Sequence, residues 1–178
     1  MGKIIIPEKV KLFIGLIYSA ERVYFKASSL LRARFGQIDF ESETLPFNQT
    51  RYYERELGND LRRKFLSFRK LIGQDKLAKI KGITDNIEKK LSSQARRLIN
   101  IDPGLLTLGK IILATSKDQK HRFYLSRGIY AEVALYYRDH AFRPWEWTYS
   151  DYRTAEYQEI FKHIRGIYSL QLKKIKEA

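Results

Sequence analysis

The feature that most constrains the fold is an apolar run near the N-terminus, Lys11–Tyr18 (KLFIGLIY), which a helical pattern follows at once. A continuous β-rich run of this length predicts a strand buried on both faces, and therefore one near the centre of a sheet. It is much shorter than the roughly 20 apolar residues that a membrane-spanning helix needs. We therefore expect a sheet-based fold and no membrane partner.

The rest of the first half alternates between helical and extended patterns. Ser19 is suited to cap a helix that runs to about Phe35, and Gly36 is suited to end it. A second amphipathic helix is predicted over Gln74–Ser92, because apolar residues recur there at steps of three and four. Three further strands are predicted over Gln37–Thr44, Arg63–Leu71 and Arg97–Ile101. This gives the order βαββαβ, which is that of a ferredoxin-like fold.

The second half is mainly extended. Strands are predicted over Gly109–Ser116, His121–Ser126 and Ile129–Arg138, with Arg127-Gly128 as a hairpin turn between the last two. A closing helix is predicted from about Thr154 to Lys176. The fold class expected is α+β: one domain over residues 1–178, with a ferredoxin-like βαββαβ order extended by a β-meander and a C-terminal helix.

Composition excludes several classes of site. The chain has no Cys, which rules out thiolate zinc sites, iron–sulfur clusters and disulfides. The three His residues do not show a metal-ligand spacing, so we expect no metal site and no cofactor. The N-terminus MGKIIIPEK is not typical of a secretory signal, which predicts a cytoplasmic location. Abundant charge with a single Met is typical of proteins from thermophiles.

Positive charge is concentrated in one part of the chain. The net charge is +14, and residues 61–97 hold twelve Lys and Arg against three Asp and Glu. We call these twelve residues the basic block. Such a block suggests a polyanionic partner, although a solvated basic face would give the same composition.

The stretch GLLTLGKI, residues 104–111, matches seven of the eight positions of a phosphate-binding P-loop. Ile111 stands where the motif needs a hydroxyl for Mg²⁺. The preceding Asp102-Pro103 favours a turn, and the residues after Lys110 favour a strand rather than the helix of a P-loop. The stretch is therefore interpreted as a turn and a strand, and Lys110 remains a candidate for contacting a phosphate in another way.

A polar cluster follows in KDQKHR, residues 117–122, and Glu132 interrupts the apolar strand pattern that comes next. A charge in that position must face solvent, pair with a cation or serve a site. One interpretation is a structural ion pair across a hairpin. The other is a pocket for a phosphorylated ligand, with His121 as the titrating group. Its candidate residues are Asp102, Lys110, Lys117, His121, Arg122 and Glu132.

Two segments combine aromatic rings with Arg, namely RYYER at residues 51–55 and WEWTYSDYR at residues 145–153. Exposed rings beside Arg can stack nucleic-acid bases, whereas buried rings fill gaps in a core. The candidate nucleic-acid contacts are Arg62, Arg63, Lys64, Arg69 and Lys70 from the basic block, with Tyr52, Tyr53, Trp145 and Trp147 as possible stacking rings.

Several long stretches, among them VKLFIGLIYS, FGQIDFES, RYYERELG, INIDPG and ILATSKDQKHRFYLSRGIYAEVALYY, resemble a small prokaryotic family. It is catalogued as domain of unknown function forty-four sixteen. The resemblance implies a stand-alone single domain and supplies no catalytic residues. Members are often labelled GTP-binding, a label that the near-match to a P-loop would explain. The family often has Tyr after Asp-Pro-Gly, where this chain has Leu105.

Three functions remain open from the sequence. The leading hypothesis is a basic protein that binds a phosphate-bearing polyanion, RNA in the first instance. The second is a GTP- or nucleotide-binding protein, or an enzyme acting on a small phosphorylated molecule, with a pocket between Asp102 and Glu132. The third is a structural subunit whose basic face docks an acidic protein.

Overall fold

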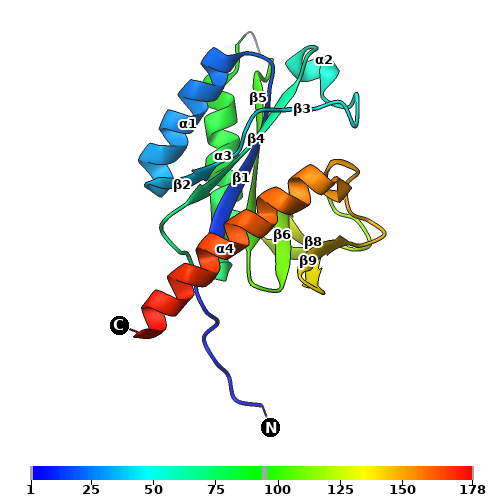
Figure 1. The fold of residues 1–178 in the computed structure, drawn as a ribbon. Helices are drawn as coiled ribbons and strands as arrows, with labels where there is room; N and C mark the ends of the chain where they lie inside the picture. The colour runs from blue at the N-terminus through cyan, green and yellow to red at the C-terminus, as the bar shows by residue number, and fades with distance from the viewer. Residues whose placement is uncertain (1, 94–95, 178) are drawn as a thin grey trace.

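The fold is built around one antiparallel sheet of nine strands, seen in a computed structural model that describes residues 2–93 and 96–177 (Figure 1). Helices α1 and α3 cover one face of the sheet, and α4 crosses the other. The strands are β1 (Lys11–Tyr18), β2 (Ile38–Glu41), β3 (Leu45–Pro46), β4 (Arg62–Phe68), β5 (Ile99–Leu106), β6 (Lys110–Thr115), β7 (Phe123–Ser126), β8 (Ile129–Arg138) and β9 (Ala141–Pro144). The helices are α1 (Glu21–Phe35), α2 (Glu54–Leu57), α3 (Leu77–Leu91) and α4 (Ala155–Glu177), with short 3₁₀ turns at Gln74–Lys76 and Asp151–Arg153.

The first half has the predicted βαββαβ order, with the short elements β3 and α2, which were not predicted, between β2 and β4. The strands lie in the order β2-β4-β1-β5, and each neighbouring pair is antiparallel. Strands β1 and β2 are therefore parallel to one another with β4 between them, and β4 and β5 are parallel with β1 between them. Two interleaved split βαβ units of this kind make the predicted ferredoxin-like arrangement, and the expected α+β class is confirmed.

The second half extends the same sheet in the order β5-β6-β8-β7, with β9 also on β8. The extension differs from a simple meander in one respect, since β8 rather than β7 pairs with β6. The ten-residue β8 offers one edge to β6 and shares the other between β7 and β9. Arg127 and Gly128 both have positive φ values, 56° and 74°, as a tight hairpin turn requires.

The two faces of β1 explain why the strand is apolar from Leu12 to Tyr18, after Lys11, whose buried amine pairs with Asp39. Leu12, Ile14 and Leu16 pack under α1 and α3, whereas Phe13 packs against α4. All eight residues of β1 are buried. The prediction that Lys11–Tyr18 forms a central strand is therefore confirmed, since β1 lies between β4 and β5.

The predicted turn at Asp102-Pro103-Gly104 is wrong. All three residues lie inside β5, which begins at Ile99 and continues to Leu106. Gly104 is required there by packing, because a Cβ atom would lie 2.3 Å from Cζ of the buried Phe13. Strand β9 was not predicted. It forms because Asp139 and His140 both adopt positive φ values, 51° and 58°, and so make a two-residue turn after β8.

The stretch GLLTLGKI forms a β-hairpin. Gly104–Leu106 ends β5, Lys110 begins β6, and the turn is held by the hydroxyl of Thr107, which accepts the backbone N–H groups of Gly109 and Lys110. A P-loop needs a helix after its Lys, so this stretch is not one.

In the part of the chain that the structure describes, none of the helices combines the length and the apolar character that crossing a bilayer would require.

Gly104 and Gly109, the two glycines of the GLLTLGKI hairpin, give a matched test of the fold. We expect Gly104→Ala to lower the free energy of unfolding by about 1–3 kcal/mol, because its methyl group would also lie 2.9 Å from the carbonyl oxygen of Ile112. Gly109→Ala has nothing within 4 Å of its new methyl group, and its effect should stay within about 0.5 kcal/mol. Urea unfolding of both variants measures the difference. Equal effects would contradict the close packing of Phe13 on Gly104.

Candidate functional site

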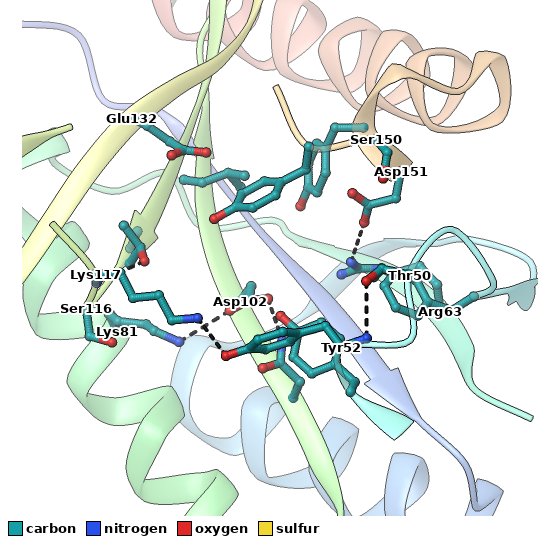
Figure 2. A pocket seen from close by; sticks show the side chains of 18 of the residues that line it. Thr50, Tyr52, Arg63, Lys81, Asp102, Ser116, Lys117, Glu132, Ser150 and Asp151 are labelled. Carbon is teal, nitrogen blue, oxygen red and sulfur yellow. Dashed lines mark hydrogen bonds and ion pairs between the residues drawn. The ribbon is translucent and has the colours of Figure 1, made fainter. Parts of the chain in front are cut away.

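A cavity of about 410 Å³ lies where β5 and β6 separate, on the side of the sheet that carries the start of α4 (Figure 2). Its volume is within the range of about 300–1,000 Å³ typical of ligand pockets. The lining is unusual for its charge, with four cationic and three carboxylate side chains beside several tyrosines. The charged lining residues are Arg63, Lys81, Arg97, Lys117, Asp102, Glu132 and Asp151.

The separation of the two strands begins at Pro103. Pairing between β5 and β6 stops at Gly104 and Leu113, although β6 continues to pair with β8 as far as Thr115. Pro103 has no N–H to donate, and proline within a sheet is confined to unpaired edges and irregular positions. We call the opening between Asn100–Asp102 and Ala114–Ser116 the fork.

Helix α3 supplies the missing partners of β5 at the fork. The N–H of Ile101 donates to Oε1 of Glu88 at 2.5 Å, and the carbonyl of Ile101 accepts from Nζ of Lys81 at 3.4 Å. Lys81 and Glu88 are seven residues apart, which places them on one side of the helix. The backbone groups of Ile101, at the unpaired edge of β5, are thus satisfied by charged side chains instead of a neighbouring strand.

A chain of polar contacts continues from Lys81 along the fork. Its Nζ lies 3.3 Å from Oδ1 of Asp102 and 3.0 Å from Oδ1 of Asp85. Asp102 also accepts from Nδ2 of Asn100, whose own Oδ1 accepts from Nη1 of Arg97 at 2.9 Å. Burial lowers the pKa of Lys81, but the carboxylates of Asp102 and Asp85 together outweigh it, so the pKa lies above its ordinary value and Lys81 is a cation.

Glu88 is the group at the fork that titrates near neutral pH. Its Oε2 accepts from Nη1 of Arg97 at 3.1 Å, and its Oε1 accepts from the backbone of Ile101. Burial nevertheless raises the pKa of Glu88 to about 7, against the opposing charges of Lys81 and Arg97. Protonation of Glu88 would therefore change the charge behind the cavity within the physiological range.

Arg63 lies on the opposite side of the cavity and is only 3% exposed. Its Nη2 donates to Oδ2 of Asp151 at 2.7 Å, and its Nε donates to the hydroxyl of Tyr157 at 3.2 Å. The guanidinium has room because Gly15 lies beside it, and a Cβ there would be 2.7 Å from Nη1. Nη1 itself has no hydrogen-bond partner within the described residues.

The predicted cluster around Glu132 is present in space. Oε2 of Glu132 accepts from Nε of Arg122 at 2.7 Å and lies 3.1 Å from Nε2 of His121. Oε1 is buried and has no partner within residues 2–93 and 96–177, although Glu132 lines the cavity. Glu132 therefore forms the ion pair expected across the hairpin and also lines a cavity, as the second interpretation expected.

Two tyrosines at the outer part of the cavity have their hydroxyls held by cations. Nζ of Lys117 donates to the hydroxyl of Tyr52 at 2.7 Å, and Nη2 of Arg122 donates to the hydroxyl of Tyr149 at 2.6 Å. Arg122 also donates to the carbonyl of Lys117 at 3.0 Å. Figure 2 shows Tyr52 and Lys117 meeting across the cavity from different segments of the chain.

Of the six predicted pocket residues, Lys110 lies away from the cavity. Asp102, Lys117 and Glu132 line it, and His121 and Arg122 lie directly behind Glu132. Lys110 is exposed at the far end of β6, opposite Tyr136, and is not among the lining residues. The P-loop pattern predicted Lys110 as a phosphate contact, but the hairpin places it away from the fork.

The predicted nucleic-acid contacts are spread over the molecule. Neighbouring residues of β4 face opposite sides, so Arg63 is buried while Arg62 and Lys64 pair with Glu21 and Glu41. Six of the basic block form salt bridges, namely Arg62, Arg63, Lys64, Lys76, Lys81 and Arg97. Arg69 donates to Gln37, and both Arg69 and Lys70 are exposed.

The candidate stacking rings divide between two places. Tyr52 and Tyr53 line the cavity. Trp145 and Trp147 stack on one another with ring centres 5.2 Å apart, and Trp147 also stacks on His121 at 5.5 Å. The rings of Trp145, Trp147 and His121 therefore form one stack, which reaches Glu132 through His121.

Sequence reasoning missed several residues of the cavity. Asp151 and Tyr152 are not among the candidate residues predicted from the sequence, and Arg63, Lys81 and Arg97 are predicted only as members of the basic block. A signal was present in α3, where the polar residues Lys81, Thr84 and Glu88 recur at helical spacing and are all buried. Among the described residues, no group of three or more His, Asp or Glu side chains is placed to hold a metal ion.

Comparison with known proteins identifies a family. Residues 8–168, most of the chain, match the family model described as Domain of unknown function (DUF4416). The chain therefore belongs to this family, as the resemblance of its long stretches implied. No curated protein and no solved structure matches it.

The raised pKa of Glu88 predicts a pH-dependent stability. The native state keeps a proton on Glu88 that the unfolded chain releases, so this group makes stability fall as pH rises from about 4.5 to about 7. Glu88→Gln should remove this fall, because the amide does not titrate; its one oxygen can accept from Ile101 or from Arg97, and the loss of the other contact is the same at every pH. Urea unfolding at several pH values gives the difference between the variant and the wild type. Glu159→Gln, in an exposed pair with Lys162, is the control. A wild type and E88Q variant with parallel pH profiles would contradict the assignment.

Proposed function

We propose that the cavity of this DUF4416 protein binds a small phosphorylated metabolite. The observation that carries the proposal is the placement of buried charge. Six charged side chains are classed as buried in the described residues, and four of them, Arg63, Lys81, Glu132 and Asp151, line this one cavity. Buried charges are costly, and they concentrate at functional sites more than elsewhere.

The cations at the cavity favour an anionic ligand. Lys117 forms no salt bridge with the described residues, and its Nζ donates only to a neutral hydroxyl. Arg63 has one nitrogen, Nη1, without a partner. The four cations of the lining exceed its three carboxylates by one charge. Arg and Lys side chains bind phosphate through charge-assisted hydrogen bonds, which are roughly twice as strong as neutral ones.

The carboxylate of Glu132 favours a ligand that also donates hydrogen bonds. Arg122 and His121 both contact Oε2, which leaves Oε1 as a buried acceptor without a partner. A buried acceptor in that state costs about 1–3 kcal/mol. A ligand hydroxyl would satisfy it. A phosphate group together with hydroxyl groups describes a sugar phosphate.

Three other functions from the sequence remain predictions with less support. Binding of GTP through GLLTLGKI lacks the loop and helix that a P-loop uses. Binding of RNA through the basic block would rely on the six residues that form no salt bridge with other described residues, because the other six are paired. Docking of an acidic protein would depend on the same residues.

Tyr152 gives a test in which stability and binding change in opposite directions. It lines the cavity, and its hydroxyl is buried without a partner in the described chain. We expect Tyr152→Phe to raise the free energy of unfolding of the ligand-free protein by about 1 kcal/mol, because an unsatisfied group is removed. The same variant should bind ribose 5-phosphate more weakly, by about fivefold, since a ligand hydrogen bond is lost. Urea unfolding and calorimetry measure the two effects.

Tyr168→Phe is the matched control. The hydroxyl of Tyr168 donates to the carbonyl of Lys9 at 2.7 Å, away from the cavity. Its removal should lower stability by about 1 kcal/mol and leave binding unchanged. Gluconate, which has hydroxyls and a carboxylate but no phosphate, should bind more weakly than ribose 5-phosphate. If the wild type binds no ribose 5-phosphate, or if both variants bind it equally, the proposal is wrong.

A further inference from the structure

Two exposed aromatic rings stand at the outer part of the cavity. Tyr52 is 61% exposed and Tyr149 is 44% exposed, and both line the cavity. Their hydroxyls are held by Lys117 and Arg122 at 2.7 and 2.6 Å. The hydroxyl ends are thus fixed in place, and each ring keeps aromatic surface that no core packing covers.

Each of these rings has a cation beside it. Nζ of Lys117 lies 4.5 Å from the centre of the Tyr52 ring, and Cζ of Arg122 lies 5.9 Å from the centre of the Tyr149 ring. A planar group that stacked on Tyr52 would therefore lie close to the unpaired charge of Lys117. A ligand that carries an anion and a planar ring a short distance apart matches this arrangement.

We propose that the metabolite is a nucleoside 5′-monophosphate. Its base stacks on the tyrosines of the outer cavity, and a ribose hydroxyl donates to Oε1 of Glu132. Its phosphate is bound by Lys117, the cation of the lining that forms no salt bridge with the described residues. This inference rests on the proposed function, since it requires that the cavity bind a phosphorylated metabolite at all. It adds the base, which ribose 5-phosphate lacks.

A free mononucleotide fits these features better than a nucleotide within RNA. The four buried charges face a bounded cavity of about 410 Å³, which accommodates one nucleotide rather than a continuous strand. A strand would also need a track of unpaired cations for its successive phosphates. Three of the four cations of the lining, Arg63, Lys81 and Arg97, are instead held by carboxylates, which leaves Lys117 to bind a single phosphate.

The experiment compares ribose 5-phosphate with adenosine 5′-monophosphate by calorimetry at near-physiological salt. Stacking of a base on an aromatic side chain changes affinity by about fivefold to more than a hundredfold. We therefore expect the wild type to bind the nucleotide at least about tenfold more tightly than the sugar phosphate. Tyr52→Leu should abolish most of this preference, whereas Tyr52→Phe, which keeps the ring, should retain most of it.

Phe25→Leu is the control variant, because Phe25 is similarly exposed at 64% but lies on α1, outside the cavity lining. It should keep the full preference. If ribose 5-phosphate and the nucleotide bind equally well, this inference is wrong and the proposed function stands. If neither binds, both are wrong. If a short single-stranded RNA binds and the mononucleotide does not, the inference is overturned in favour of a polymer surface.

Discussion

The end of strand pairing at Pro103 is the constraint on which the rest of the site depends. A strand residue without an N–H cannot complete a ladder, so β5 and β6 part at Gly104 while β6 remains attached to β8. The opening leaves backbone groups of Ile101 to be satisfied by Lys81 and Glu88. The fork thus creates both the cavity and the need for charged side chains around it.

The charged side chains on the two sides of the cavity are held in place by ion pairs, one on each side. Lys81 pairs with Asp102, and Arg63 pairs with Asp151. Removing one member of such a buried pair typically costs about 3–5 kcal/mol, because the other charge is left without compensation. A purely structural network would use up its hydrogen-bonding capacity within itself. Here Nη1 of Arg63 and Oε1 of Glu132 have none of the described residues as partners, which is why we interpret the network as a preorganised ligand site.

Sequence patterns predicted the elements well where periodicity was the signal. The helices α3 and α4 followed from the spacing of apolar residues. The strand β1 followed from a continuous apolar run, and the βαββαβ order followed from the two kinds of pattern together. Asp102-Pro103-Gly104 misled the prediction because the residues that favour turns also suit a strand edge and a close approach of two backbones. The hairpin turn at Asp139-His140 was missed because its second residue is His instead of the Gly typical of that position, although Asp is common at the first.

The site was only partly predictable for a similar reason. Glu132 could be found because a charge within an apolar strand needs an explanation, and the structure places His121 and Arg122 beside it. Arg63 could not be identified as a site residue, because a count of charges does not distinguish it from Arg62 and Lys64. Those two residues face the other side of β4. Which side of β4 faces the cavity depends on where α4 packs, and that contact joins residues far apart in the sequence.

The most direct measurement is a crystal structure of the protein grown with a saturating phosphorylated ligand, first ribose 5-phosphate. The account predicts density for the phosphate inside the cavity, within hydrogen-bonding distance of Nζ of Lys117, and a ligand hydroxyl on Oε1 of Glu132. A cavity that stays empty, or a phosphate bound only to exposed lysines of the basic block, would contradict the claim that the charges at the fork form a ligand site.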